Sequence, residues 1–240
     1  MSKTAHHELT RKEMKGPDKF QVAATEAAAW AAKRRRLVLV AVVGGFALVA
    51  AVIGVSAYLD SARTDAGGLL YRAVDAASGE VSSIPLPNVD RPLYKTAAEK
   101  QQAVLAAAAQ VRERHGGSRA AATAALLEGD AHLAAGAWDK AAAAYQTFLD
   151  KTGEDDSLRF GALDGLARAQ EGKGDLAAAA KTYEQATRID FYKDRATLER
   201  ARVLVKAGKK SDAQAALASI AKESPLAVEA QERLARLGGQ

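Results

Sequence analysis

The 240-residue chain has a formal net charge of +5, and nine Lys or Arg against four Asp or Glu in residues 1–36 account for all of it. The excess charge is therefore confined to one end and gives no sign of a nucleic-acid-binding surface, which needs cations clustered on a folded domain. The absence of cysteine excludes disulfides, thiol nucleophiles and thiolate metal sites, and an alanine content of about a quarter favours helices.

Residues 1–36 form a basic arm, in which a break is expected at Pro17. From Asp18 an alanine-rich helix could run unbroken into the next segment. Anionic lipid headgroups would attract the arm, at about 1 kcal/mol for each nearby cation. His6 and His7 could contact a metal, but no third ligand follows at a suitable spacing, so no metal site is predicted.

Residues 37–59, LVLVAVVGGFALVAAVIGVSAYL, contain no charged side chain. As a helix they would extend about 34 Å, enough to cross a hydrocarbon core of about 30 Å, so we expect one transmembrane helix. Four cations at residues 33–36 precede it, and cations are retained on the cytoplasmic side, which predicts a cytoplasmic N-terminus. The alternative is a cleaved signal peptide ending at residues 55–57 (VSA), although its leader and apolar core would both be longer than usual.

Small residues recur at a spacing of four along this apolar segment. Ala41 with Gly45, and Ala50 with Gly54, would let a second membrane helix pack closely against this one. Because Ala and Gly are common in membrane helices, the pattern also arises by chance, and a helix–helix contact here is a hypothesis.

Residues 60–95 are expected to form a juxtamembrane helix, weakened by glycines at 67–68, and then a linker. The prolines of SGEVSSIPLPNVDRPLY exclude a helix interior, so residues 79–94 are predicted to be an extended loop. A loop of this length either links two parts of a chain or makes contacts.

Residues 96–240 contain a repeat. Gly136, Gly174 and Gly208 each lie between two amphipathic helical segments; the second and third are 34 residues apart, and an acidic turn at 153–156 explains the longer first interval of 38. A 34-residue helix-turn-helix period is typical of tetratricopeptide repeats. The predicted fold is therefore all-α: one transmembrane helix followed by a tetratricopeptide helical solenoid. The competing interpretation is a set of alanine-rich helical hairpins in chance register.

Side-chain sizes follow the same register. Small residues at equivalent positions would let paired helices approach closely, and larger ones would fill the space between pairs. The small residues are Gly129, Ala167, Ala201, Ala141, Ala179 and Ala213, and the large ones are Tyr145, Tyr183 and Leu217.

The two ends of the repeat array carry further helices. Residues 226–237 are predicted to cap the stack, with Leu226, Ala230, Leu234 and Leu237 on one face. Residues 96–113 are a candidate for half of a further, degenerate repeat.

This layout resembles the YfgM-like family of ancillary Sec translocon subunits. The residues that carry the resemblance are KRRR and the span 37–59, the following segment DSARTDAGGLLYRAVDAA, and the repeats from Ala121 onward. The resemblance implies a bacterial inner-membrane protein with a periplasmic domain that meets secreted chains, periplasmic chaperones or the translocon. The proline-bearing loop 79–94 departs from the pattern and leaves the partner open.

Tetratricopeptide stacks bind partners through the concave face made by the first helix, helix A, of each repeat. The resemblance places the following residues in this groove: Asp130, Leu133, Asp164, Arg168, Glu171, Arg195, Leu198, Arg202 and Lys206. Their mixed charge, with cations toward the C-terminal end, would suit an extended or helical segment that bears acidic groups. The alternative is that these charges only solvate an outer helix face.

Enzymatic functions find little support in the sequence, and no cofactor is predicted. His132 lies in a helix at a position usually held by a packing residue, no nucleophile–base pair is evident, and no glycine-rich phosphate loop occurs. We therefore expect a non-enzymatic, membrane-anchored interaction protein. The rival functions are a scaffold of another envelope assembly, such as pilus, secretion or outer-membrane machinery, and a membrane-tethered hydrolase.

Overall fold

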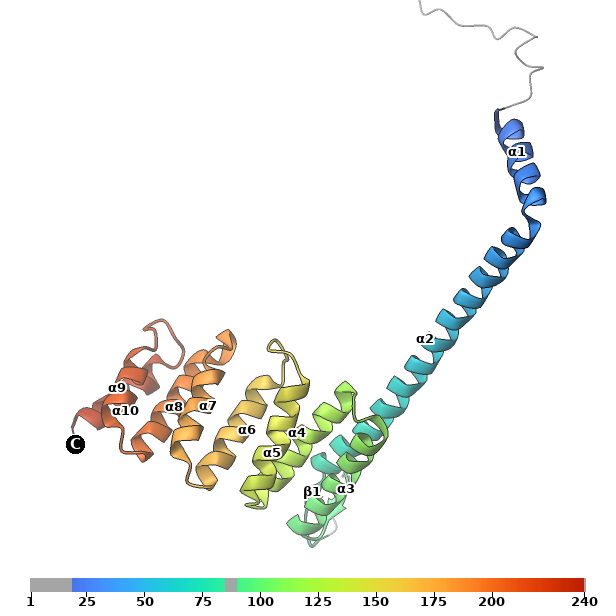
Figure 1. Cartoon of the computed structure of the whole chain (residues 1–240). Coiled ribbons are helices and arrows are strands. Elements are labelled where there is room, and N and C mark those ends of the chain that lie inside the picture. Colours follow the sequence, from blue (N-terminus) through green and yellow to red (C-terminus); the bar gives the residue numbers. More distant parts are fainter. Residues whose placement is uncertain (1–18, 85–89, 240) are drawn as a thin grey trace, which may run out of the picture. The chain divides into compact units, whose positions relative to one another are not determined.

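The computed structural model describes residues 19–84 and 90–239 (Figure 1). The chain divides into two compact units, Met1–Asp60 and Ser61–Gln240. The predictions for His6, His7 and Pro17 lie outside the described residues. Each unit is described by itself below.

The first unit contains α1 (Lys19–Lys33) and the beginning of α2 (Arg35–Ser78). The prediction of one unbroken helix is wrong, because the helix is interrupted at Arg34. Its amide donates to the carbonyls of both Trp30 and Ala31, each at 3.2 Å, a shared bond that is common at helix ends. The Arg34 guanidinium lies over the Trp30 ring, 5.1 Å from the ring centre. The Arg34 carbonyl accepts the first hydrogen bond of α2, from the Val38 amide.

The apolar part of α2 is long and apolar enough to cross a membrane, with a mean hydropathy of 2.8 over its most apolar window. Its side chains at 39–59 are all exposed within the unit. Ala41 and Ala50 are exposed, and a Cβ added to Gly45 or Gly54 would meet no atom within 4 Å. Within the described residues, the apolar side chains at 39–59 are thus not covered by other parts of the protein.

The second unit begins with the end of α2, which continues through residues 67–68 to Ser78 without the weakness that its glycines suggested. Leu69 and Ala73 of α2 are buried against α3 (Ala97–His115) and α4 (Arg119–Ala134). His115 Nε2 lies 2.8 Å from Asp65 Oδ2, which fixes the C-terminal end of α3 beside the start of this unit. α3 therefore packs against the C-terminal end of α2.

The linker contains a short strand pair that the sequence did not predict. β1 (Glu80–Val81) pairs in parallel with β2 (Leu93–Tyr94), in register Glu80↔Leu93, and closes the loop between them. The Lys100 ammonium of α3 donates to the Gly79 carbonyl at 2.7 Å and ties this strand pair to the helical stack.

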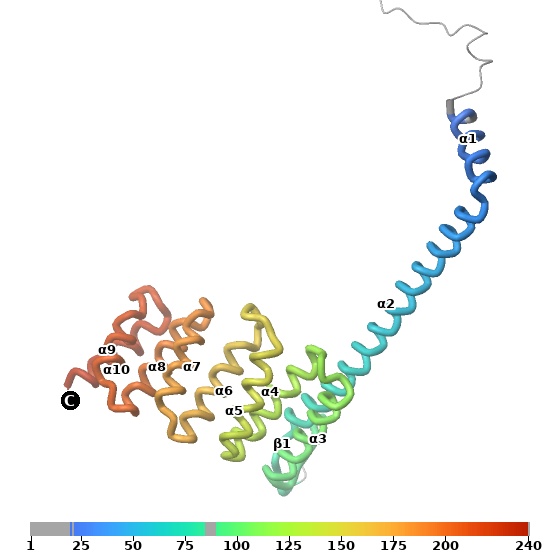
Figure 2. The backbone as a smooth tube through the Cα atoms, in the orientation of Figure 1, coloured from blue at the N-terminus to red at the C-terminus, as the bar shows by residue number. Residues whose placement is uncertain are grey.

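The helices after α3 form successive antiparallel hairpins, which Figure 2 shows as a regular up-and-down trace. Their bounds after α4 are α5 (Trp138–Lys151), α6 (Arg159–Gly172), α7 (Leu176–Ala186), η2 (Asp190–Tyr192), α8 (Lys193–Lys206), α9 (Lys210–Ala218) and α10 (Ala227–Gly238). The predicted all-α solenoid is confirmed, with α4, α6 and α8 as the A helices of its repeats.

The hairpin turns contain the three glycines identified from the repeat. Gly136, Gly174 and Gly208 have φ angles of 69°, 85° and 74°, the left-handed region that glycine enters at little cost. Such a residue ends a helix and lets the chain reverse within a few residues. The turns are therefore equivalent in backbone conformation as well as in sequence position.

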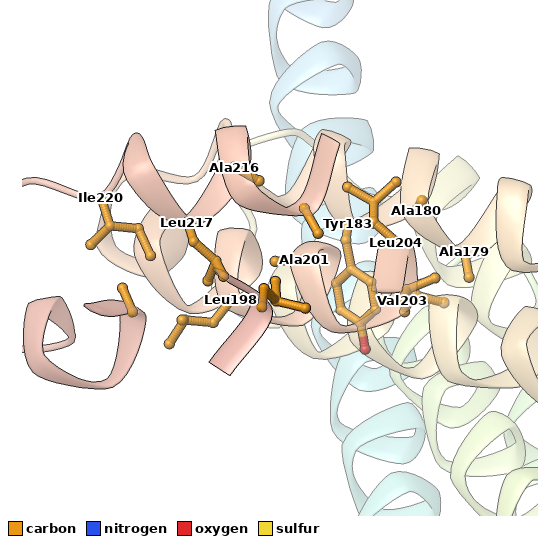
Figure 3. Packing of buried hydrophobic residues seen from close by; sticks show 14 residues of the cluster. Ala179, Ala180, Tyr183, Leu198, Ala201, Val203, Leu204, Ala216, Leu217 and Ile220 are labelled. Carbon is orange, nitrogen blue, oxygen red and sulfur yellow. The ribbon is translucent and has the colours of Figure 1, made fainter. Parts of the chain in front are cut away.

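The core consists mostly of alanine and a few large side chains. All the small residues of the repeat register are buried, and so are Tyr145, Tyr183 and Leu217. Figure 3 shows the cluster around Tyr183, Leu198 and Leu217. The predicted face of α10 closes this cluster, with Ala230 and Leu237 buried and Leu226 and Leu234 packed beside them.

An ion pair with a buried carboxylate explains how the longer first interval is accommodated. The Arg119 guanidinium at the start of α4 donates to Asp156 Oδ1 at 2.9 Å, and the Asp156 side chain is only 7% exposed. The same oxygen accepts from the Leu158 amide at 2.9 Å. Asp156 thus folds the acidic turn back onto the first repeat, so the extra residues leave the stacking register intact.

Candidate protein-binding groove

The C-terminal halves of the A helices enclose a pocket of about 380 Å³. It is lined by Leu133 of α4, Trp138 of α5, Arg168, Glu171 and Gly172 of α6, and Arg202 and Lys206 of α8. Five of these residues were assigned to the groove from the sequence: Leu133, Arg168, Glu171, Arg202 and Lys206. The fold therefore brings together, from three repeats, side chains that lie up to 73 positions apart in the chain.

An ion network organises the floor of this pocket. Glu171 accepts two bonds from Arg202, from Nη1 at 2.8 Å and Nη2 at 2.7 Å, and a third from the Lys206 ammonium at 3.1 Å. These donors hold the pKa of Glu171 down at about 2, although its partial burial opposes the shift. Arg202 Nε also donates to Glu199 at 2.8 Å, so its guanidinium is held from both sides.

Exposure separates the two signs of charge. The Glu171 and Glu199 side chains are 14% and 13% exposed, whereas those of Arg168 and Lys206 are 60% and 56% exposed. The two carboxylates therefore lie beneath the surface of the pocket, and the two cations reach the solvent. A ligand that enters the pocket meets a cationic surface beside the apolar side chains of Leu133 and Trp138.

Asp130 and Asp164 do not line this pocket; each accepts a hydrogen bond from a buried tyrosine of its own repeat. Tyr145 donates to Asp130 Oδ1 at 2.6 Å and Tyr183 to Asp164 Oδ1 at 2.9 Å. Burial raises the pKa of Asp130, and burial together with the neighbouring carboxylates raises the pKa of both tyrosines. These acids join helix A to helix B within each repeat.

Leu198 was assigned to the groove, and this assignment is wrong. Its side chain is fully buried in the cluster that contains Leu217 (Figure 3). Leu198 and Asp164 both lie ten residues before a turn glycine, and Leu217 and Tyr183 both lie nine residues after one. The third repeat thus has an apolar pair where the second has a tyrosine–aspartate hydrogen bond.

Arg195 lies outside the pocket and pairs with Glu199 at 3.4 Å, one turn away on α8. Trp138, which was not among the groove residues assigned from the sequence, also lines the pocket. Its ring lies against Gly172, where an added Cβ would come within 2.6 Å of it. Gly172, two residues before the turn glycine Gly174, is the sequence feature that permits this close approach.

The described residues contain no group of three or more His, Asp or Glu side chains arranged to hold a metal ion. His132 is half-buried, and burial lowers its pKa. Within the described part of the chain its Nδ1 atom is buried without a hydrogen-bond partner. This environment suits a neutral histidine at the boundary of the core.

A search of the curated proteins finds no match to this chain. A family model described as the tetratricopeptide repeat-like domain matches residues 28–237. The matched region starts before the apolar segment, includes every repeat helix and ends in α10. The chain therefore belongs to the tetratricopeptide repeat-like domain family.

Proposed function

We propose that this protein is a membrane-anchored interaction module whose A-helix groove binds acidic segments of partner proteins. The observation that carries the proposal is the pocket in which Trp138 and Leu133 adjoin the exposed cations Arg168 and Lys206. An apolar recess beside outward-facing cations fits a segment with an apolar side chain next to carboxylates. Tetratricopeptide repeat-like proteins are typically non-enzymatic, which supports a binding role.

The anchor in this proposal is residues 37–59. Its support is the exposed apolar surface of α2, a length sufficient for a bilayer, and the cations that precede it. We place the N-terminal arm in the cytoplasm of a bacterium and the repeats in the periplasm, at the inner membrane. The arm would also contact anionic lipid headgroups.

The resemblance to YfgM-like proteins suggests the partners: Sec translocon subunits, periplasmic chaperones or secreted chains. The competing partner is another envelope assembly. In both cases the partner would bind the same groove. The two possibilities therefore differ only in which proteins co-purify with the chain.

Co-purification of the full-length chain from mild detergent, followed by mass spectrometry, tests this function. The variant Arg168→Glu/Lys206→Glu reverses both exposed cations, and Lys181→Glu reverses an exposed cation on α7 as the control. We expect the wild type and the control to recover the same translocon subunits, and the double variant to lose at least about tenfold, because like charges repel across an interface.

Recovery of a pilus, secretion or outer-membrane assembly instead would support the scaffold function. Equal recovery of the same proteins by the double variant would show that the groove is not the binding surface. Circular dichroism must show that both variants retain the helix content and melting temperature of the wild type.

A further inference from the structure

One edge of the repeat array is formed by the loops that lead into its A helices. Because successive helices are antiparallel, the loops before α6, α8 and α10 lie on this edge and the glycine turns lie on the opposite one (Figure 2). We call the segments 116–118, 152–158, 187–192 and 219–226 the loop edge. This surface is distinct from the groove.

The part of α2 that belongs to the second unit begins at the loop edge. Asp65 lies beside His115 at the end of α3, whereas Gly79, just after α2, accepts from Lys100 near the start of α3. This segment of α2 is therefore antiparallel to α3 and runs in the direction of the A helices. Contacts between successive loops continue the edge as far as α10: Lys151 with Gly116, Arg119 with Asp156, Phe160 with Tyr192, and Ser224 with Asp194.

The length of the chain limits how far this edge can lie from the membrane. Asp65 follows Leu59, the last residue of the apolar segment, by six positions. Six residues span at most about 21 Å when fully extended, so the loop edge begins within that distance of the end of the proposed span, whatever the angle between the two units.

Exposed apolar side chains occur along the loop edge. Phe191 is 88% exposed, more than Phe46 of the apolar segment at 74%. Leu158, just before α6, and Val228, in the first turn of α10, are exposed as well. Each comes from a different loop or helix start, so these side chains are distributed along the edge and are not gathered in one recess.

The backbone on both sides of Phe191 is fixed. Ile189 packs against the core, and its carbonyl accepts from the Tyr192 amide at 2.9 Å. The Tyr192 ring stacks on Phe160 with ring centres 4.0 Å apart, and Phe191 makes an edge contact with Tyr192 at 4.9 Å. The phenyl ring therefore projects from a preformed turn, which reduces the conformational entropy lost on binding.

Charge on this edge is nearly balanced. Residues 152–159, 187–193 and 219–228 contain the cations Arg159, Arg188, Lys193 and Lys222, and the acids Glu154, Asp155, Asp156, Asp190 and Glu223. Such a surface attracts neither anionic lipid nor a highly charged protein strongly. Aromatic and apolar side chains that settle at the headgroup level of a bilayer do not need a net charge.

We propose that the loop edge rests on the bilayer that residues 37–59 cross, with Phe191 inserted at the headgroup level and Leu158 and Val228 beside it. This inference rests on the anchor of the proposed function and adds a second membrane contact to it. Because the anchor already holds the edge close to the lipid, a weak contact is sufficient. Glu171 comes twelve residues after the start of α6, which places the groove pocket about 18 Å from this edge.

Tryptophan fluorescence of the full-length chain in phosphatidylcholine nanodiscs tests this inference. Trp30→Phe/Trp138→Phe removes both native tryptophans, and Phe191→Trp then adds a single reporter on the loop edge. We expect its emission to shift to shorter wavelength and to fall by about half with lipids brominated near the headgroup, because an interfacial side chain lies about 5–10 Å into the headgroup boundary. Lys209→Trp, at an exposed position beside the turn glycine Gly208, is the control and should show neither change.

Two further variants in the Phe191→Trp background test the other apolar side chains. Leu158→Ser/Val228→Ser should remove at least about half of the quenching, because it removes apolar surface from the contact. Val205→Ser, which changes an exposed valine of α8 away from the loop edge, should leave the quenching unchanged. Exchanging part of the phosphatidylcholine for anionic phosphatidylglycerol should also leave it unchanged.

Equal quenching of Phe191→Trp and Lys209→Trp would overturn the membrane contact, and so would quenching that requires the anionic lipid. A shift to shorter wavelength without quenching by lipid would show that protein covers Phe191, which also contradicts the inference. Phe46→Trp in the same background reports on the anchor through lipids brominated deep in the acyl chains. Quenching of Phe46→Trp without quenching of Phe191→Trp would overturn the loop-edge contact alone, whereas the absence of both would overturn the anchor of the proposed function.

Discussion

Replacing Gly165 with alanine should destabilise the protein by about 2–4 kcal/mol, the sum of an overpacked core position and a lost buried hydrogen bond. A Cβ at Gly165 would lie 2.6 Å from the Tyr145 hydroxyl oxygen and still closer to the ring. Tyr145 is fully buried and has α4 on its other side, where Gly129 makes a similarly close approach. The ring can therefore move only by breaking its bond to Asp130.

Gly161→Ala is the matched control for this variant. Gly161 lies one turn earlier on the same helix, is exposed, and an added Cβ there would meet no atom within 4 Å. Alanine at this position should stabilise the protein by up to about 1 kcal/mol through helix propensity alone. Urea unfolding of the full-length proteins in detergent, followed by circular dichroism, measures both. Similar stabilities for the two variants would contradict the packing of Tyr145 between its glycines.

Acid should reduce the stability that the ion network of Glu171 contributes to the protein. Because Arg202 and Lys206 lower the pKa of this carboxyl to about 2, its contribution to stability is complete above its ordinary pKa of 4.5 and is lost as the pH falls toward 2. Glu171→Gln removes the contribution at all pH values. We expect the variant to be less stable by about 1–2 kcal/mol at pH 7, a value reduced for the solvent exposure of the two cations.

Urea unfolding of both proteins between pH 7 and pH 2 measures this effect. The difference between them should be constant above pH 5.5, shrink below that and vanish near pH 2. Glu184→Gln, which removes an exposed ion pair with Arg200 (3.4 Å), should change stability little at pH 7. A difference between wild type and Glu171→Gln that does not depend on pH would mean that the carboxylate is not the group that titrates.

The repeat architecture could be predicted because its determinants are local. A left-handed turn needs glycine, so Gly136, Gly174 and Gly208 mark the hairpins directly. The fixed distance from each turn glycine to residues such as Ala179 and Tyr183 then gives the register of small and large side chains. The capping helix could be predicted from its own periodicity.

Other features depend on contacts that a periodic pattern does not contain. The strand pair Glu80–Val81 and Leu93–Tyr94 is too short to show alternation. The break at Arg34, where one amide is shared between two carbonyls, lies within a sequence that is strongly helical on both sides and carries no Gly or Pro to mark it. Leu198 was misplaced because its position in the repeat was known but not its burial against helix B. Trp138 was missed as a groove residue because it begins α5, a B helix, whereas the groove positions were taken from the A helices alone.

Cysteine labelling would locate the groove and the arm relative to the membrane in one measurement. The chain has no cysteine of its own, so Ala24→Cys on α1 and Lys181→Cys on α7 would each be the single reactive thiol, and both positions are exposed. A membrane-impermeant maleimide added to spheroplasts should label Lys181→Cys at once and Ala24→Cys only after lysis. Labelling of Ala24→Cys with protection of Lys181→Cys, or protection of both until lysis, would contradict a single span that displays the repeats outside the cytoplasm.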